Sequence, residues 1–191
     1  MRRILPLLIA CLVAPLLSGC VGLAATGVGA AAFMVEDRRT AGTYVEDENI
    51  EWKILRITSD RFGAAHINAT SYNRKVLLTG EVPDDGQRKA VEDAVRTVAG
   101  VTDVTNELSV AGNSSLASRG NDTAITGSVK SRMLRNGKFS ANHVKVVTEG
   151  GTVYLMGLVS AAEADAAVEV ARSTAGVTRV VKVFEILPAA K

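Results

Sequence analysis

The chain repeats itself, and this internal duplication limits the fold more than any other feature of the sequence. The segment HINATSYNRKVLLTGEV at 66–82 is similar to HVKVVTEGGTVYLMGLV at 143–159, and AGVTDV at 99–104 is similar to AGVTRV at 175–180. Each copy has the same order of patterns: a helix, two alternating strands joined by a turn, an amphipathic helix and a last strand. The sequence therefore predicts one small domain built twice.

Each copy is expected to fold as an α+β domain. The first covers 46–110 and the second 121–187, and the Gly- and Ser-rich residues 111–120 between them predict a flexible linker. Both helices of a copy should cover one face of its sheet, so each αββαβ unit is a two-layer sandwich. Helices are expected at 46–61, 85–98, 121–136 and 161–174, and final strands near 101–110 and 177–186.

Short signals mark the turns and the core of each copy. Asn73-Arg74 and Gly150-Gly151 are predicted hairpin turns. Gly100 and Gly176 stand where a glycine commonly ends a helix. Apolar residues three or four positions apart predict the buried stripes of the two first helices, which are Ile50, Ile54 and Ile57 in one copy and Ile125, Val129 and Met133 in the other.

The first 20 residues have the layout of a secretory signal. Arg2 and Arg3 precede an uncharged run at 4–17, which is shorter than the roughly 20 apolar residues of a spanning helix. The sequence LSGC at 17–20 resembles a bacterial lipobox, which implies a signal peptide at 1–19 and lipidation of Cys20. A cysteine placed there by chance is the alternative.

The residues after Cys20 bear on where the protein is held. Val21, in place of Asp, implies the outer membrane and its periplasmic face, since in lipoproteins of this kind Asp at that position commonly signals inner-membrane retention. Two or more acyl chains, such as palmitate, hold a protein stably on a bilayer. Residues 20–45 would then be anchor and tether, and a flexible tether is favoured over an interfacial segment because glycines at 22, 27 and 29 disfavour a helix.

A family resemblance follows from these motifs in this order. A hairpin with Gly after Val-x-Leu-x, then a helix leading to Ala-Gly-Val-x-x-Val, resembles the BON (bacterial OsmY and nodulation) domain. Two copies behind a lipobox, with Asn121-Asp122-Thr123 opening the second, resemble the two-BON lipoproteins of the outer membrane. The resemblance implies a module that binds phospholipid or associates with membranes, is no enzyme, supports outer-membrane integrity and localises to division sites.

Composition and motifs leave little room for catalysis. The sequence has no Gly-x-Ser-x-Gly elbow and no phosphate-binding loop. Cys11 leaves with the signal and an acylated Cys20 has no thiol, so no disulfide and no cysteine-based metal or redox site is expected. His66 and His143 are equivalent in the repeat, which favours a shared structural role as a polar cap over the sheet rather than catalysis or metal binding. We therefore expect no enzyme, cofactor, metal or small-molecule substrate.

Charge separates the two copies. Without Arg2 and Arg3 the chain has 20 basic and 20 acidic residues, a balance that does not indicate nucleic-acid binding. Residues 46–110 hold 12 acids and 8 bases, whereas residues 121–187 hold 6 acids and 8 bases. If either domain binds an anionic membrane, it should be the second. The predicted lipid-binding face of its first helix consists of Ala124, Gly127, Lys130, Ser131, Leu134, Arg135 and Lys138.

Ala124, Trp52 and Leu55 bear further on how the protein binds its partner. In relatives of this kind an aromatic residue follows Asn-Asp-Thr and enters the lipid, but here that residue is Ala124. Trp52 and Leu55 point away from the core stripe of the first copy, and we expect them to pack between the domains or to mark a partner surface. The sequence thus favours an anchored periplasmic protein that binds anionic phospholipid such as phosphatidylglycerol. The alternative is an envelope adaptor that binds a protein, such as assembly or peptidoglycan-associated machinery.

Overall fold

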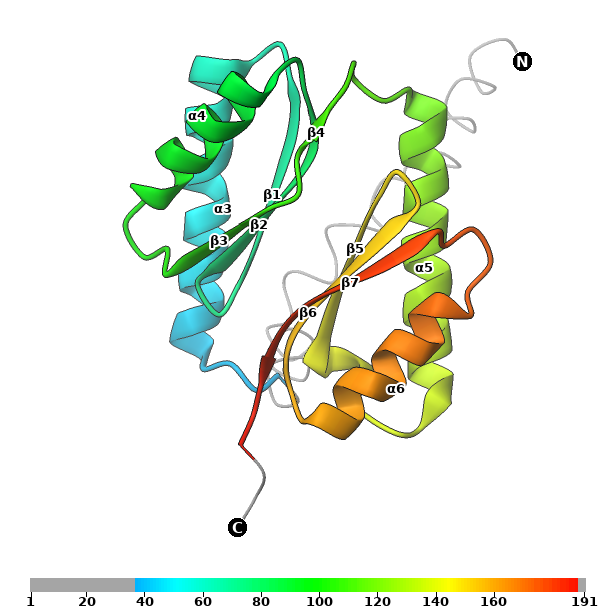
Figure 1. Ribbon diagram of the computed structural model, residues 1–191. Helices are drawn as coiled ribbons and strands as arrows, with labels where there is room; N and C mark the ends of the chain where they lie inside the picture. Colours follow the sequence, from blue (N-terminus) through cyan, green and yellow to red (C-terminus); the bar gives the residue numbers. More distant parts are fainter. Residues whose placement is uncertain (1–36, 189–191) are drawn as a thin grey trace, which may run out of the picture. The chain divides into compact units, whose positions relative to one another are not determined.

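The computed structural model describes residues 37–188, and from Arg38 onward these belong to one compact unit that contains both copies (Figure 1). The predicted signal peptide, Cys20 and the tether up to residue 36 lie outside the described residues. Among the helices of residues 37–188, none is both long enough and apolar enough to cross a bilayer.

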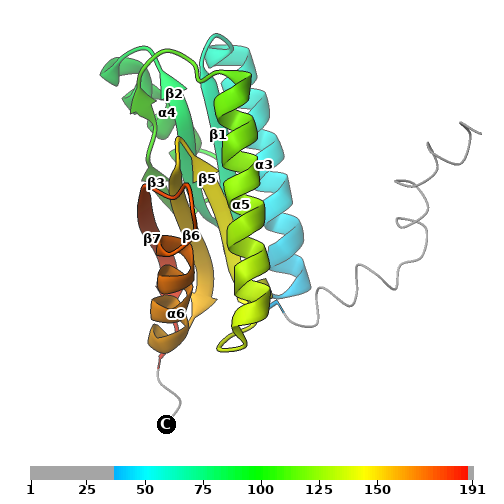
Figure 2. The same ribbon diagram turned by 90° about the vertical axis from the view of Figure 1, so that its right-hand side faces the viewer.

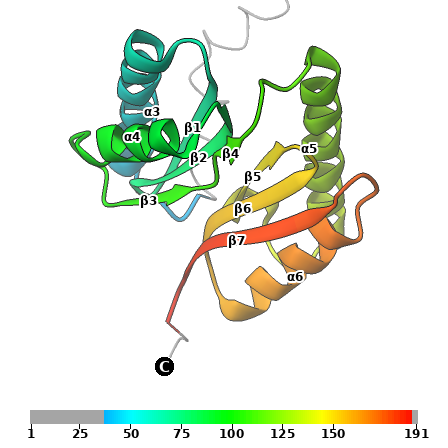
Figure 3. The same ribbon diagram turned by 45° about the horizontal axis from the view of Figure 1, so that its top comes forward.

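The first domain is a mixed sheet with two helices on one face (Figures 1 and 3). The central strand β2 pairs antiparallel with β1 and parallel with β3 and the short β4. The elements are α3 (Ala41–Phe62), β1 (His66–Tyr72), β2 (Lys75–Val82), α4 (Asp85–Arg96), β3 (Asp103–Asn106) and β4 (Ser109–Val110).

The second domain repeats this arrangement, with β6 between an antiparallel β5 and a parallel β7. Its helices also share one face of the sheet (Figures 1 and 2). The elements are α5 (Leu116–Asn136), a 3₁₀ turn (Ala141–His143), β5 (Val144–Glu149), β6 (Thr152–Val159), α6 (Ala161–Arg172) and β7 (Arg179–Ile186). The α+β fold with two tandem sandwiches is therefore confirmed.

Both hairpin turns lie where the sequence placed them. Asn73 and Arg74 have φ of 52° and 64°, and Gly150 and Gly151 have φ of 56° and 74°. Two consecutive residues with positive φ make the turn that matches the twist of an antiparallel pair.

A buried aspartate from the long helix holds each hairpin turn, a role that sequence reasoning missed. The backbone N–H groups of Gly150 and Gly151 donate to the carboxylate of Asp122 at 3.0 and 2.9 Å. In the first domain, the N–H groups of Asn73 and Arg74 donate to Asp47 at 2.9 and 2.7 Å. The sequence-based charge count treated both aspartates as surface acids, but both are almost fully buried.

Two helix boundaries differ from expectation. The side chains of Thr40 and Ser115 accept a hydrogen bond from the backbone three residues on, so α3 and α5 begin at Ala41 and Leu116, about one turn early. The second half of the expected linker 111–120 is therefore helical.

The glycine signals for the second helices were also misread. Helices α4 and α6 end at Arg96 and Arg172, before Gly100 and Gly176. These glycines have φ of 100° and 87° and lie under the long helices, where an added Cβ would come within 3.2 Å of Ile50 and 3.1 Å of Ile125. Close helix packing, rather than a helix end, requires glycine there.

Three apolar cores hold the unit together. One core per domain lies between the sheet and its helices. Ile125, Val129 and Met133 are buried as expected, and so are Ile50 and Ile54, whereas Ile57 is only partly buried against the core. The third core joins the helix-free faces of the two sheets, with Tyr72 and Leu77 from the first domain and Tyr154, Met156 and Leu158 from the second. Each bare sheet face thus buries its apolar side chains against the other domain.

Polar contacts surround this shared core. Lys75 pairs with Glu185 at 3.0 Å and Arg179 with Glu107 at 3.2 Å. The described core residues all lie between residues 47 and 187, so a fragment that begins at Arg38 keeps all three cores.

Candidate functional site

The outward face of α5, with Lys138 just beyond its end, carries the predicted lipid-binding residues. The stripe of Ile125, Val129 and Met133 packs against the sheet, so the opposite side of the helix faces away from it. Leu134 is 71% exposed although it stands among cations. We call the following exposed set the basic face of α5: Ala124, Gly127, Lys130, Ser131, Leu134, Arg135 and Lys138.

Among residues 37–188, no acidic side chain forms an ion pair with this face, although Glu48 lines the same groove as Lys130. Asp122 is the one acidic residue of α5, and it is buried on the hairpin turn. Within the part of the chain that the structure describes, no carboxylate lies within ion-pair distance of Lys130, Arg135 or Lys138. The remaining base of the helix end, Arg132, donates to the Ser173 hydroxyl at 2.9 Å and so lies toward the end of α6. Three cations therefore keep their charge for an external partner.

A groove of about 430 Å³ lies beside this face and brings in a residue that sequence reasoning missed. Lys130 and Leu134 line it together with Tyr44 of α3. Tyr44 is 37% exposed, and the Arg39 guanidinium lies 5.0 Å from the centre of its ring. The structure thus places an aromatic side chain next to the basic face, although position 124 holds alanine. No local signal could have paired Tyr44 with a helix some 80 positions later.

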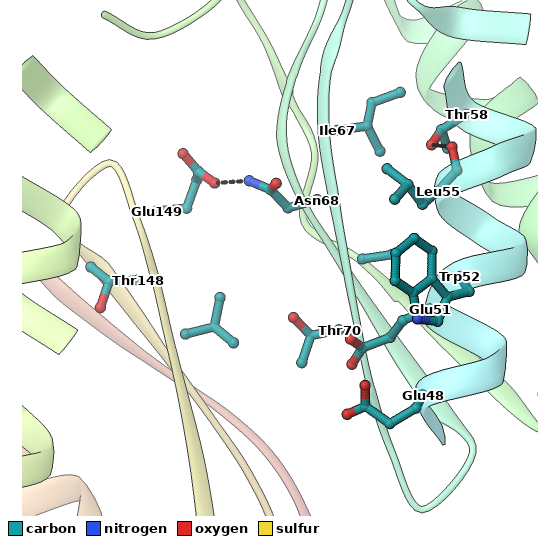
Figure 4. Close-up of a pocket in the computed structure, with 12 residues that line it drawn as sticks. Glu48, Glu51, Trp52, Leu55, Thr58, Ile67, Asn68, Thr70, Thr148 and Glu149 are labelled. Atoms are coloured by element: carbon teal, nitrogen blue, oxygen red, sulfur yellow. Dashed lines mark hydrogen bonds between the residues drawn. The ribbon is translucent and has the colours of Figure 1, made fainter. Parts of the chain in front are cut away.

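Trp52 and Leu55 lie elsewhere, on a second groove of about 460 Å³ between α3, β1 and β5 (Figure 4). Trp52 is 68% and Leu55 51% exposed, and neither belongs to the core shared by the domains. The pair therefore lines a groove bordered by both domains, whereas the apolar core that joins the domains lies between the bare sheet faces. Glu48 and Glu51 give the groove an acidic side.

The two equivalent histidines cap their strands beside carboxylates. The Nδ1 of His66 lies 2.9 Å from Glu81, and the Nδ1 of His143 lies 3.5 Å from Glu163. Burial alone would raise the pKa of Glu81, but hydrogen bonds from Ser114 and His66 outweigh it and hold the pKa below its usual range. Two hydrogen bonds from Arg38, with further bonds from Ser160, lower the pKa of Glu163 to about 2.

Comparison with known proteins identifies the domains. The family model described as the BON domain matches residues 46–112 and 121–188. The outer membrane lipoprotein DolP of Haemophilus influenzae is 37% identical over 174 residues, which is 90% of each chain. The 21 kDa hemolysin of Actinobacillus pleuropneumoniae is 39% identical over 78% of each chain. Osmotically-inducible protein Y of Escherichia coli is 31% identical over 73% of this chain and 72% of its own.

These relatives support a coarse description of the protein. The relation to the Haemophilus lipoprotein places the chain at the outer membrane as a lipid-anchored envelope protein. The relatives are BON-domain proteins that are not known as enzymes. The chain therefore belongs to the BON-domain family and carries two copies of the domain.

Proposed function

We propose that the basic face of α5 docks on anionic phospholipid, of the phosphatidylglycerol type, while Cys20 anchors the chain in the outer membrane. The observation that carries the proposal is the absence of any acidic partner for Lys130, Arg135 and Lys138 within residues 37–188, beside an exposed Leu134. A solvated helix face of a protein with balanced charge normally mixes both signs. This one presents cations around one apolar side chain, which suits the boundary between headgroups and acyl chains.

The expected strength follows from the residues. Each base near an anionic surface contributes about 1 kcal/mol, so three contribute about 3 kcal/mol. Burial of the exposed part of Leu134 adds about 1–2 kcal/mol. The sum corresponds to a dissociation constant of roughly 1 mM, which is weak for a free domain. A short tether supplies an effective concentration in the millimolar range, so the anchored protein would be about half docked.

Tyr44 bears on the alanine at position 124. Tyrosine favours the interface between water and lipid, where its ring is apolar and its hydroxyl stays wet. Since Tyr44 lines the groove that Lys130 and Leu134 also line, it can enter the same headgroup layer. It would take over part of the contribution of the missing aromatic residue.

Vesicle co-sedimentation of the fragment from Arg38 onward tests this proposal. We expect binding to phosphatidylglycerol vesicles at low salt, weaker binding at high salt, and none to phosphatidylcholine vesicles. The triple variant Lys130→Glu, Arg135→Glu, Lys138→Glu should lose binding. The matched control reverses three exposed bases of α3: Lys53, Arg56 and Arg61. Equal loss in both triple variants, or binding that is indifferent to salt, would refute a specific basic face.

In cells, docking would support outer-membrane integrity, including at division sites. A strain that carries only the α5 triple variant should become sensitive to detergents and large antibiotics and lose septal enrichment of the tagged protein. The α3 triple variant should behave like wild type.

A second candidate function is an envelope adaptor. It is favoured by the groove that Trp52 and Leu55 line, because exposed aromatic side chains in a groove are common anchors for protein partners. In that case Trp52→Ala would abolish capture of an outer-membrane assembly or peptidoglycan-associated partner, and the α5 triple variant would not. Vesicle binding separates the two functions, since the adaptor needs none.

A further inference from the structure

We propose that His66 and Glu149 bind one transition-metal ion of the Zn²⁺ class, with Glu81 holding the His66 ring from the second shell, and that the ion joins the two domains. The ligand atoms that these three residues offer lie within 4.8 Å of one another. His66 and Glu81 belong to β1 and β2 of the first domain, whereas Glu149 ends β5 of the second. The proposal is independent of lipid docking, which uses other residues.

Hydrogen bonds fix the state of the imidazole ring. The Nδ1 of His66 lies 2.9 Å from the Oε2 of Glu81, and since an ionised carboxylate can only accept, Nδ1 carries the proton. The backbone N–H of Ser114 also donates to the Oε2 of Glu81, at 3.0 Å. In the neutral ring, Nε2 then carries the lone pair that would bind the metal ion. This carboxylate–histidine arrangement is the usual second shell of a metal-bound histidine.

A second ligand faces that lone pair. The side-chain amide of Asn68 lies 3.2 Å from Nε2 of His66. It donates to Oε2 of Glu149 at 3.0 Å, as Figure 4 shows. One exposed amide nitrogen thus lies between two acceptors from different domains. A metal ion would take the place of that amide and bind both acceptors, with water in the remaining positions.

Electrostatics favours a cation at this point. Glu149 and Asp122 line the same cavity as His66, and Glu81 lies against the His66 ring. Arg119, which lines the same cavity, donates to the Ser114 hydroxyl and to none of these carboxylates in the described contacts. Negative charge therefore gathers around a nitrogen ligand. An imidazole with carboxylate favours Zn²⁺ and its neighbours, because Mg²⁺ and Ca²⁺ prefer oxygen ligands alone.

The distances require a small adjustment. Zn–N and Zn–O bonds of about 2.0–2.2 Å put neighbouring tetrahedral ligands roughly 3.4 Å apart. Closing the present spacing needs rotation of Glu149, a side chain at the end of an edge strand.

Titration calorimetry of ZnCl₂ into the fragment from Arg38 onward, without lipid, tests the site. We expect one Zn²⁺ per chain, and no comparable heat from MgCl₂. His66→Gln and Glu149→Gln should abolish this binding, and Glu81→Gln should weaken it 10- to 100-fold. Glu149→Gln can still accept the Asn68 hydrogen bond, so its fold should be preserved. Two controls should keep full binding: Asn68→Ala, which removes only the displaced amide, and His143→Gln, the equivalent histidine of the second domain.

Urea unfolding gives a second readout that does not depend on calorimetric heat. Zn²⁺ should raise the unfolding midpoint of the wild type and of Asn68→Ala, and leave that of Glu149→Gln unchanged. The proposal is wrong if the wild type binds no Zn²⁺ or if Glu149→Gln binds Zn²⁺ as tightly as the wild type does. It is also wrong if His143→Gln loses as much Zn²⁺ affinity as His66→Gln. None of these outcomes affects the lipid proposal.

Discussion

Removal of the buried Asp122 carboxylate should destabilise the second domain more than any surface change. The variant Asp122→Ala takes away both acceptors of the β5–β6 turn, whose N–H groups lie 3.0 and 2.9 Å from the carboxylate. A hydrogen bond to a charged group contributes about 1.5–3 kcal/mol. The loss of two such bonds therefore costs about 3–6 kcal/mol. The variant no longer buries a charged group, which reduces the net loss of stability to about 3 kcal/mol.

This loss is large for a domain of this size. At roughly 0.05–0.15 kcal/mol per residue, a domain of about 70 residues has about 3–10 kcal/mol of stability. Asp122→Ala should thus bring the second domain close to unfolding. Asp122→Asn, which keeps one acceptor, should cost about half as much.

Urea unfolding followed by circular dichroism measures the loss, and hydrogen exchange locates it. Backbone amides of 144–159 should exchange faster in Asp122→Ala than in wild type. Asp165, an exposed acid on α6 with no described ion pair, gives the matched control, and Asp165→Ala should change stability by less than about 0.5 kcal/mol. A loss below about 1 kcal/mol for Asp122→Ala, or one equal to that of the control, would refute the role assigned to this carboxylate.

Three other predictions concern stability. Because its bonds to Arg38 and Ser160 lower the pKa of Glu163 from 4.5 to about 2, this carboxylate stabilises the fold above pH 4.5 and loses that effect as the pH falls toward 2. Between pH 5 and pH 2, the free energy of unfolding of the wild type should therefore fall by about 2–3 kcal/mol more than that of Glu163→Gln. The same fall for both proteins would contradict this. Gly157→Ala should destabilise the second domain, since the new Cβ would come within 2.3 Å of the His143 carbonyl oxygen. Gly127 lies within α5 with open space around it, so Gly127→Ala should stabilise the second domain by about 0.5–1 kcal/mol. Thermal melts should show a lower melting temperature for Gly157→Ala and a higher one for Gly127→Ala.

Local patterns predicted the domains well. The two-residue turns and the periodic stripes of α3 and α5 depend on neighbours close in sequence, and the duplication shows that the same pattern occurs twice. The helix starts at Ala41 and Leu116 were harder to place. Thr40 and Ser115 look like ordinary loop residues, and only the structure shows that they cap helices.

Long-range roles were mostly out of reach. The burial of Asp47 and Asp122 depends on a turn that lies 26–29 positions further along the chain. One signal was present and went unused: β2 and β6 are apolar on both faces, with consecutive buried residues from Val76 to Leu78 and from Val153 to Met156. Such continuous runs are typical of strands covered on both sides, which indicates a second layer against each sheet. These runs would have predicted that the two domains pack through their sheets rather than through Trp52.

The core shared by the two sheets also sets an order of events during synthesis and export. The first domain leaves the ribosome or translocon before β6 exists, so Tyr72 and Leu77 have no partner for their side of the sheet until residues 154–158 arrive. During that interval an apolar sheet face is open to other chains and to chaperones, a state prone to aggregation. This face is buried only when the second domain packs on the first. The second copy therefore completes the folding of the copy that was synthesised before it.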